Sequence, residues 1–159
     1  MTKDLVVRIK ARASDPKLRT DACDGHSTSY PVFLAKPAST AVIAEAERKL
    51  GFELPPLLRT LYRKVANGGF GPAYGIIGLD ENGWLDVDHD VALPDLYAMF
   101  RRGDNWPDRF LPICNDGCGM YSIIDCNTVN AEMVFSGGVT LEGGGIAFEQ
   151  WLEKWVNRT

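Results

Sequence analysis

The segment from residue 80 to residue 90 holds the densest group of side chains that could bind a metal ion or a partner. It contains Asp80, Glu81, Trp84, Asp86, Asp88 and Asp90. Carboxylates at alternate positions are typical of calcium loops, but such loops also need a Gly and a terminal Glu where this chain has Val91 and Tyr97. We therefore predict no metal here. The segment is either a solvated loop or a contact surface for a cationic protein, with Trp84 as its apolar anchor.

The cysteines and histidines are the other candidates for chemistry. Cys114, Cys118 and Cys126 lack the second closely spaced pair that structural zinc sites use, so we predict no zinc and expect the first and last of them in the core. A cysteine nucleophile would need a nearby base. His26 lies in a polar segment and His89 in the acidic one, and we expect both to be solvated. A Cys-dependent hydrolase is accordingly a remote alternative.

Glycine-rich stretches at 68–71 and 143–145 lack the Lys and Ser/Thr of a phosphate-binding loop, and we interpret them as turns and helix caps. No cofactor is expected. The first stretch lies in a turn that is a second candidate for partner binding. Its candidate residues are Asn67, Gly68, Gly69, Phe70 and Tyr74.

Charge is distributed unevenly along the 159 residues, whose net charge is −4. Residues 1–64 contain 12 Lys/Arg and 7 Asp/Glu, and residues 65–159 contain 5 and 14, so the halves carry +5 and −9. This balance does not favour nucleic-acid binding, which needs clustered cations. No long apolar run or signal-like start is present, so we expect a cytoplasmic protein with reduced thiols that does not bind membranes.

Periodicity and end signals predict an α+β fold, with a mostly antiparallel sheet and helices packed around it. Helices are expected near 4–13, 40–50, 56–65, 95–102 and 147–155, and strands at 74–79, 111–114, 120–125 and 132–135. We expect turns at 115–117 and 127–130, and an ion pair between Glu45 and Lys49. The predicted core includes Leu50, Leu61, Tyr62, Ile113, Trp151 and Leu152. Residues 1–38 would form an N-terminal helix and extended segment, and residues 39–159 the α+β domain, within one compact unit.

Four stretches carry motifs that are specific in combination: 46–55, 57–62 with 67–75, 111–119 and 148–152. The first contains Leu50-Gly51 and Leu54-Pro55, and the second closes in the Asn-Gly-Gly turn. In this order and spacing they resemble the SUKH superfamily of the Smi/Knr type over roughly residues 40–155. Many relatives carry an aromatic residue where this chain has Asp116.

The resemblance implies a non-enzymatic α+β domain that binds other proteins. Such domains often serve as bacterial immunity proteins that neutralise a cognate toxin, including nucleases and deaminases. The alternative that it implies is a regulatory or scaffolding module, as in the yeast relative. We hypothesise the immunity role, with the 80–90 segment as the contact surface.

Overall fold

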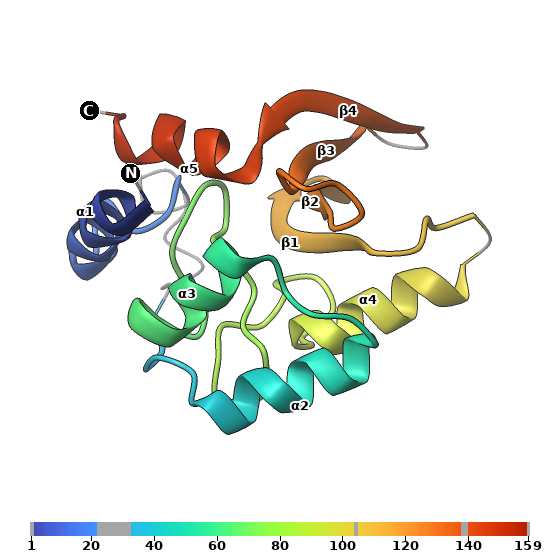
Figure 1. Ribbon diagram of the computed structural model, residues 1–159, viewed down its shortest axis with the longest axis horizontal. Coiled ribbons are helices and arrows are strands. Elements are labelled where there is room, and N and C mark those ends of the chain that lie inside the picture. The colour runs from blue at the N-terminus through green and yellow to red at the C-terminus, as the bar shows by residue number, and fades with distance from the viewer. Residues whose placement is uncertain (1, 22–32, 104, 138–139, 159) are drawn as a thin grey trace.

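The computed structural model describes residues 2–21, 33–103, 105–137 and 140–158. Its helices are α1 (Thr2–Ser14), α2 (Thr40–Leu50), α3 (Pro56–Lys64), α4 (Leu93–Arg102) and α5 (Phe148–Val156). Its strands are β1 (Phe110–Gly117), β2 (Met120–Asp125), β3 (Glu132–Gly137) and β4 (Thr140–Ala147). Figure 1 shows α2, α3 and α4 below the sheet, while α5 runs from the end of β4 to α1. The α+β fold class is confirmed.

The helix ends follow the signals in the sequence. The Ser39 side chain accepts a hydrogen bond from the backbone N–H of Val42 and caps α2, and Gly51 ends that helix in the left-handed region at φ 84°. Pro56 is the first residue of α3, where its missing N–H costs no helical hydrogen bond. The predicted ion pair is wrong, because Glu45 binds the guanidinium of Arg48 at 2.6 and 2.8 Å. The planar fork of arginine fits a carboxylate in two places, which a lysine ammonium cannot do.

The sheet is an antiparallel meander in the order β1-β2-β3-β4. The predicted strand at 120–125 is confirmed, but the turn expected at 115–117 is wrong, because these residues belong to β1. The chain reverses instead at Cys118 and Gly119, both with positive φ. Strand β4 was not predicted from the sequence. It includes Gly143–Gly145, which we had interpreted as turn and cap chemistry because glycine disfavours strands.

The strand predicted at 74–79 is also wrong. This segment runs beside β1 and makes only an isolated bridge between Ile76 and Cys114, with a further hydrogen bond from Ile77 N to Ile113 O at 2.8 Å. Gly75 has a φ of 89°, which takes the backbone out of the extended conformation. The apolar residues are therefore buried as expected without forming a regular strand.

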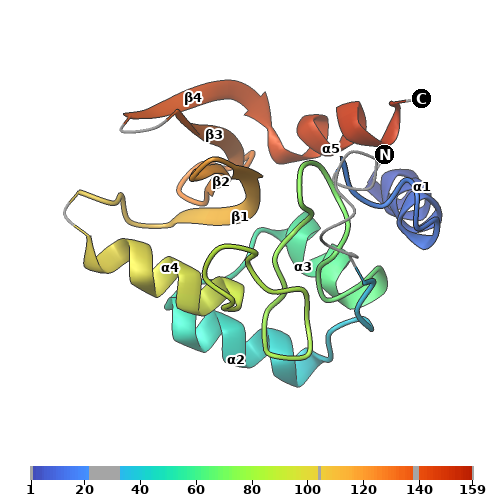
Figure 2. The ribbon, with the colours of Figure 1, turned by 180° about the vertical axis from the view of Figure 1, so that it is seen from behind.

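One core cluster joins all of the helices to the sheet. The six predicted core residues are all buried: Leu50, Leu61, Tyr62, Ile113, Trp151 and Leu152. Helix α1 packs against α3 and α5, and Figure 2 shows α1 beside α5. Arg8 of α1 donates hydrogen bonds to Glu153 of α5 at 2.8 Å and to Asn157 at 3.1 Å. Most of the extended segment expected at 20–37 lies outside the described residues.

Candidate functional site

Asn67 joins the end of α3 to the segment 80–90, which we call the acidic loop. Its side-chain Oδ1 accepts a hydrogen bond from the backbone N–H of Leu79 at 2.7 Å, and its Nδ2 donates to Asp80 at 2.8 Å. Its backbone carbonyl accepts from the N–H of Trp84 at 3.0 Å. The two candidate segments that the sequence suggested separately are therefore one structural unit, held by a buried asparagine.

Two glycines permit close contacts between backbone segments around Asn67. Gly69 has a φ of 89°, and a Cβ at that position would lie 2.3 Å from the carbonyl oxygen of Phe33. Gly83 lies against Asn67, where a Cβ would come within 2.7 Å of the Asn67 carbonyl oxygen. A larger residue at position 83 would push the acidic loop away from Asn67, whereas one at position 69 would clash with the backbone of Phe33.

Trp84 lies beneath the acidic loop, contrary to the expectation of an exposed anchor. It is only 9 % exposed. Its ring contacts Phe33 edge to face, with ring centroids 5.6 Å apart, and its indole N–H donates to the carbonyl of Tyr74 at 2.9 Å. The sequence shows that a tryptophan is present but not that a backbone carbonyl ten positions away holds it inward. Trp84 therefore fixes the shape of the loop and offers little surface to a partner.

Asp86 is the centre of a buried polar network. Its carboxylate has no exposed surface and accepts hydrogen bonds from the Tyr121 hydroxyl at 3.0 and 3.1 Å, from Asn115 Nδ2 at 3.0 Å and from the backbone N–H of His89 at 3.0 Å. Nδ1 of His89 lies 2.7 Å from the same carboxylate. Burial, with the adjacent Asp86 carboxylate, raises the pKa of Tyr121, so its hydroxyl stays a donor. Buried charges persist when they are bonded in this way.

The remaining acidic residues of the acidic loop have exposed surface, although Asp80 and Asp88 also bind Asn67 and Asn115. Glu81, Asp88 and Asp90 are exposed, and Asp80 is partly exposed. Glu81 and Asp90 line one shallow groove of about 280 Å³ whose floor includes Trp84 and Val87. Among the described residues, those lining this groove include no lysine or arginine. The groove consequently presents negative charge above an apolar floor.

A family model described as SMI1 / KNR4 family (SUKH-1) matches residues 37–154. The chain belongs to this family. A search of curated proteins found no match. In this SUKH-1 chain, two of the motif stretches meet at the acidic loop, because Asn67 binds Asp80 while Asn115 Nδ2 binds Asp88 at 2.8 Å and Asp86 at 3.0 Å. The family motifs therefore provide the base on which the loop is mounted.

Asp116 and Ser122 form a second polar contact of the SUKH-1 fold, between β1 and β2. The Ser122 hydroxyl lies 2.9 Å from both carboxylate oxygens of Asp116. Burial raises the pKa of Asp116 to about 6; the Ser122 hydrogen bond lowers it and the charge of Asp21 adds to the rise.

The histidine and cysteine candidates differ in burial and in their partners. His89 is exposed, as expected, but its Nδ1 lies 2.7 Å from the Asp86 carboxylate. Cys114 is fully buried in the core, Cys126 is partly buried against it, and Cys118 is exposed in the β1–β2 turn. Burial raises the pKa of Cys114 and raises that of Cys126 to about 12, so both thiols resist ionisation. His26 and Cys23 lie outside the described residues.

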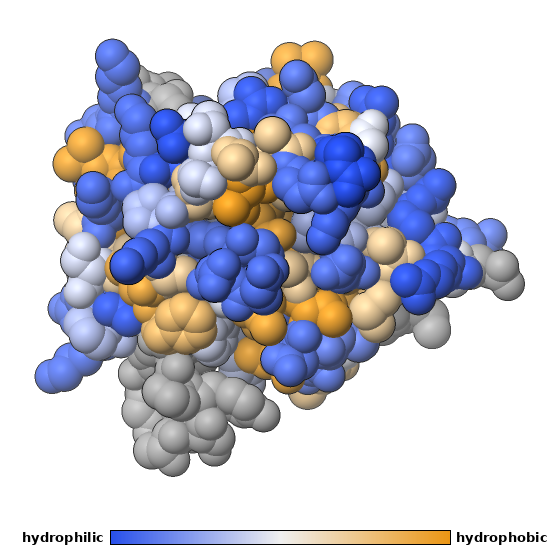
Figure 3. Space-filling model, turned by 90° about the horizontal axis from the view of Figure 1, so that it is seen from below, coloured by the Kyte–Doolittle hydropathy of each residue, from blue (hydrophilic) through white to orange (hydrophobic). Residues whose placement is uncertain are grey.

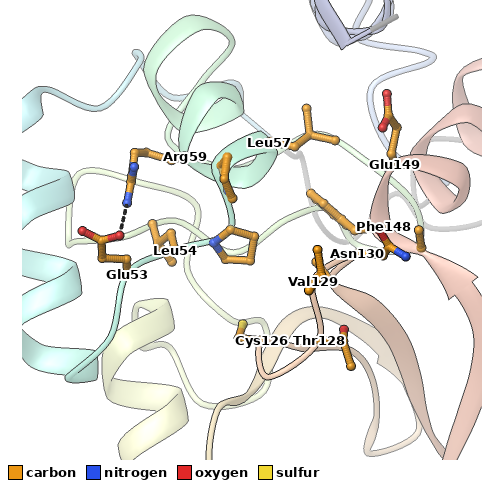
Figure 4. A pocket seen from close by; sticks show the side chains of 14 residues that line it. Glu53, Leu54, Leu57, Arg59, Cys126, Thr128, Val129, Asn130, Phe148 and Glu149 are labelled. Atoms are coloured by element: carbon orange, nitrogen blue, oxygen red, sulfur yellow. Dashed lines mark ion pairs between the residues drawn. The ribbon is translucent and has the colours of Figure 1, made fainter.

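A second cavity, of about 470 Å³, was not suggested by any sequence motif. Figure 4 shows it between the α2–α3 connection, the β2–β3 turn and the start of α5. Arg59 points along one wall and is already paired, with Glu47 at 3.0 Å and with Glu53 at 3.6 Å. Val129 stands fully exposed at the opposite rim. The mixture of paired charges and one exposed apolar side chain gives this cavity no clear preference for a charged ligand.

Within the described ranges, no cluster of three or more His, Cys, Asp or Glu side chains could hold a metal ion. None of the helices in the described part of the chain combines the length and apolar character needed to cross a membrane. On the face seen from below, Figure 3 shows hydrophobic residues scattered among hydrophilic ones.

Proposed function

We propose that this protein is a cytoplasmic, non-enzymatic immunity protein that neutralises a cognate toxin by covering its active surface. Membership of the SUKH-1 family supports a domain that binds other proteins. The observation that carries the proposal is the acidic loop, in which Glu81, Asp88 and Asp90 are exposed around a rigid buried base. A preorganised group of carboxylates loses little conformational entropy when it binds.

The proposed partner carries a cationic surface. A nuclease must attract the phosphates of its substrate, and clustered carboxylates on a binding protein satisfy the same cations. The opposite charges also accelerate encounter, an effect that falls as ionic strength rises. The contact residues in this proposal are Asp80, Glu81, Asp88 and Asp90, with Trp84 and Asp86 beneath them as support.

The secondary candidates have a different place in this proposal. Asn67 binds Asp80 and Trp84 of the acidic loop. Gly68 lies against Ile76 and Gly78, the N–H of Gly69 donates to the Ile76 carbonyl, and Phe70 is fully buried. Tyr74 is partly exposed, and its carbonyl holds the Trp84 indole. The turn therefore acts by positioning the loop.

Binding kinetics test the proposal. The partner is first identified by pull-down and mass spectrometry, and its toxin activity is measured with and without this protein. The acidic-loop variant combines Glu81→Lys and Asp90→Asn. Asn is chosen at position 90 because it tolerates the positive φ of 55° there. The matched control is Glu132→Lys with Asp95→Asn, which changes the net charge equally at exposed sites outside the groove.

The acidic-loop variant should associate at least about tenfold more slowly at low salt and protect less well against the toxin, whereas the control should stay within about twofold of wild type. Equal effects of the two variants would place the interface elsewhere. A captured partner without toxic activity would favour the regulatory or scaffolding role instead.

A further inference from the structure

A second groove, between α1 and α3, has the opposite charge. It has a volume of about 740 Å³. Its lining consists of Lys3, Val6, Val7, Lys10, Pro37, Thr60, Arg63 and Lys64. The charged members are four exposed cations, and the lining contains no carboxylate. We call it the basic groove.

The cations of the basic groove have no ionic partner among the described residues. In the part of the chain that the structure describes, none of Lys3, Lys10, Arg63 and Lys64 forms an ion pair. Other arginines of the same two helices are neutralised: Arg8 of α1 binds Asp4 and Glu153, and Arg59 of α3 binds Glu47. Four like charges around one groove repel one another, so a ligand that neutralises them relieves this repulsion.

The basic groove also has apolar lining residues, among them Val6 and Val7 of α1. Val7 is 67 % exposed although it lies on the same helix as the buried Val6. Covering this side chain would remove apolar surface from water, which favours binding. A ligand that carries both carboxylates and an apolar side chain therefore gains from two sources at once.

We infer that the basic groove binds an acidic, amphipathic segment of a protein partner. Charge complementarity selects a polyanion, and the exposed valine selects one with apolar side chains among its carboxylates. The groove is concave and lies between two helices, so a single peptide segment can enter it, whereas a flat bilayer or a wide duplex would touch only its rim. This inference does not depend on the acidic loop being a toxin interface.

Fluorescence anisotropy tests the inference on the full chain. The probe is a fluorescein-labelled peptide of glutamates with leucines at helical spacing. A glutamate peptide without leucine, and a peptide with lysine in place of glutamate, serve as ligand controls. Duplex DNA and phosphatidylserine vesicles are measured in parallel.

The groove variant is Lys10→Glu with Lys64→Glu. The control is Lys49→Glu with Arg102→Glu, which makes the same charge change at exposed positions that do not line the groove. We expect saturable binding of the glutamate–leucine peptide, weakened about tenfold or more in the groove variant and less than about twofold in the control. Val7→Ser should weaken that peptide but leave the leucine-free peptide unchanged. Circular dichroism melts establish that each variant is folded.

Three outcomes would overturn the inference. Equal weakening by the two charge variants would indicate a nonspecific effect of net charge. Binding of vesicles or DNA through the groove without binding of the peptide would identify a membrane or nucleic-acid surface. Self-association in sedimentation experiments that disappears only in the groove variant would make a second copy of this chain the occupant.

Discussion

The hydroxyl of Tyr121 on β2 lies 3.0 Å from a carboxylate oxygen of Asp86 in the acidic loop, 35 positions away in the chain. Asn115 on β1 donates to the same carboxylate at 3.0 Å. Two neighbouring strands therefore hold the base of the acidic loop, and the exposed carboxylates are displayed from a fixed frame. Disturbing this frame should affect stability and binding together.

Tyr121→Phe should lower the free energy of unfolding by about 1.5–3 kcal/mol, because it removes a donor to a buried charged acceptor. Denaturant unfolding measures this loss. Adding Asp86→Asn completes a double-mutant cycle, in which the two costs should not add because both changes act on one hydrogen bond. Strict additivity would show that the two side chains do not interact in solution.

Asn67→Ala should loosen the acidic loop. The substitution leaves the buried N–H of Leu79 without its acceptor and costs about 1–3 kcal/mol. Hydrogen exchange should become faster at the amides of Leu79 and Trp84 and stay slow in β2. Asn127→Ala is the control, because Asn127 is exposed and binds Asp108 and Asp125 away from the loop. Similar exchange profiles for the two variants would contradict the role of Asn67.

The helix ends and the core residues of this chain could be predicted from the sequence, whereas strand β4 and the burial within the acidic loop could not. Ser39, Gly51 and Pro56 act through their immediate neighbours, so the helix ends could be located without a structure. Strand β4 could not, because its glycines disfavour a strand and its pairing with β3 is decided by the sheet. Nothing in the sequence alone distinguishes the buried Trp84 and Asp86 from the exposed Asp88. Their burial depends on Tyr121, Asn115 and Tyr74, whose proximity only the fold creates.

Leu61→Ala tests the packing of α3. Leu61 is completely buried in the common core, and its truncation should cost about 2–5 kcal/mol through lost transfer energy and the cavity left behind. The exposed Val7→Ala should change stability by no more than about 0.5 kcal/mol. A thermal or denaturant transition of Leu61→Ala that matched wild type would contradict the assignment of this helix to the core.

The thiols should differ in reactivity according to burial. In a Cys23→Ser background, Cys118 should react quickly with a thiol reagent in the native state because it is exposed. Cys114 should react only after unfolding, since burial both shields it and raises its pKa. Cys126, whose pKa is raised to about 12, should be slow. Mass spectrometry of labelled peptides identifies each site, and rapid native labelling of Cys114 would contradict the register of β1 against β2.

Asp116 should make the protein less stable as pH rises. Its pKa is about 6 when folded and near 3.8 when unfolded, so between these values the folded state holds a proton that the unfolded state has lost. The stabilisation from this proton is complete below about pH 4 and disappears as pH rises through about 6. Asp116→Asn keeps a partner for Ser122 without the charge. The variant should therefore be more stable than wild type at pH 8, by about 2 kcal/mol or less, and the difference should shrink as pH falls towards 4. Urea unfolding of both proteins across this range measures the difference directly, with Asp95→Asn as an exposed carboxyl control. A difference that is constant with pH, or a variant less stable than wild type at pH 8, would show that the Asp116 carboxyl is not held in the buried environment between β1 and β2.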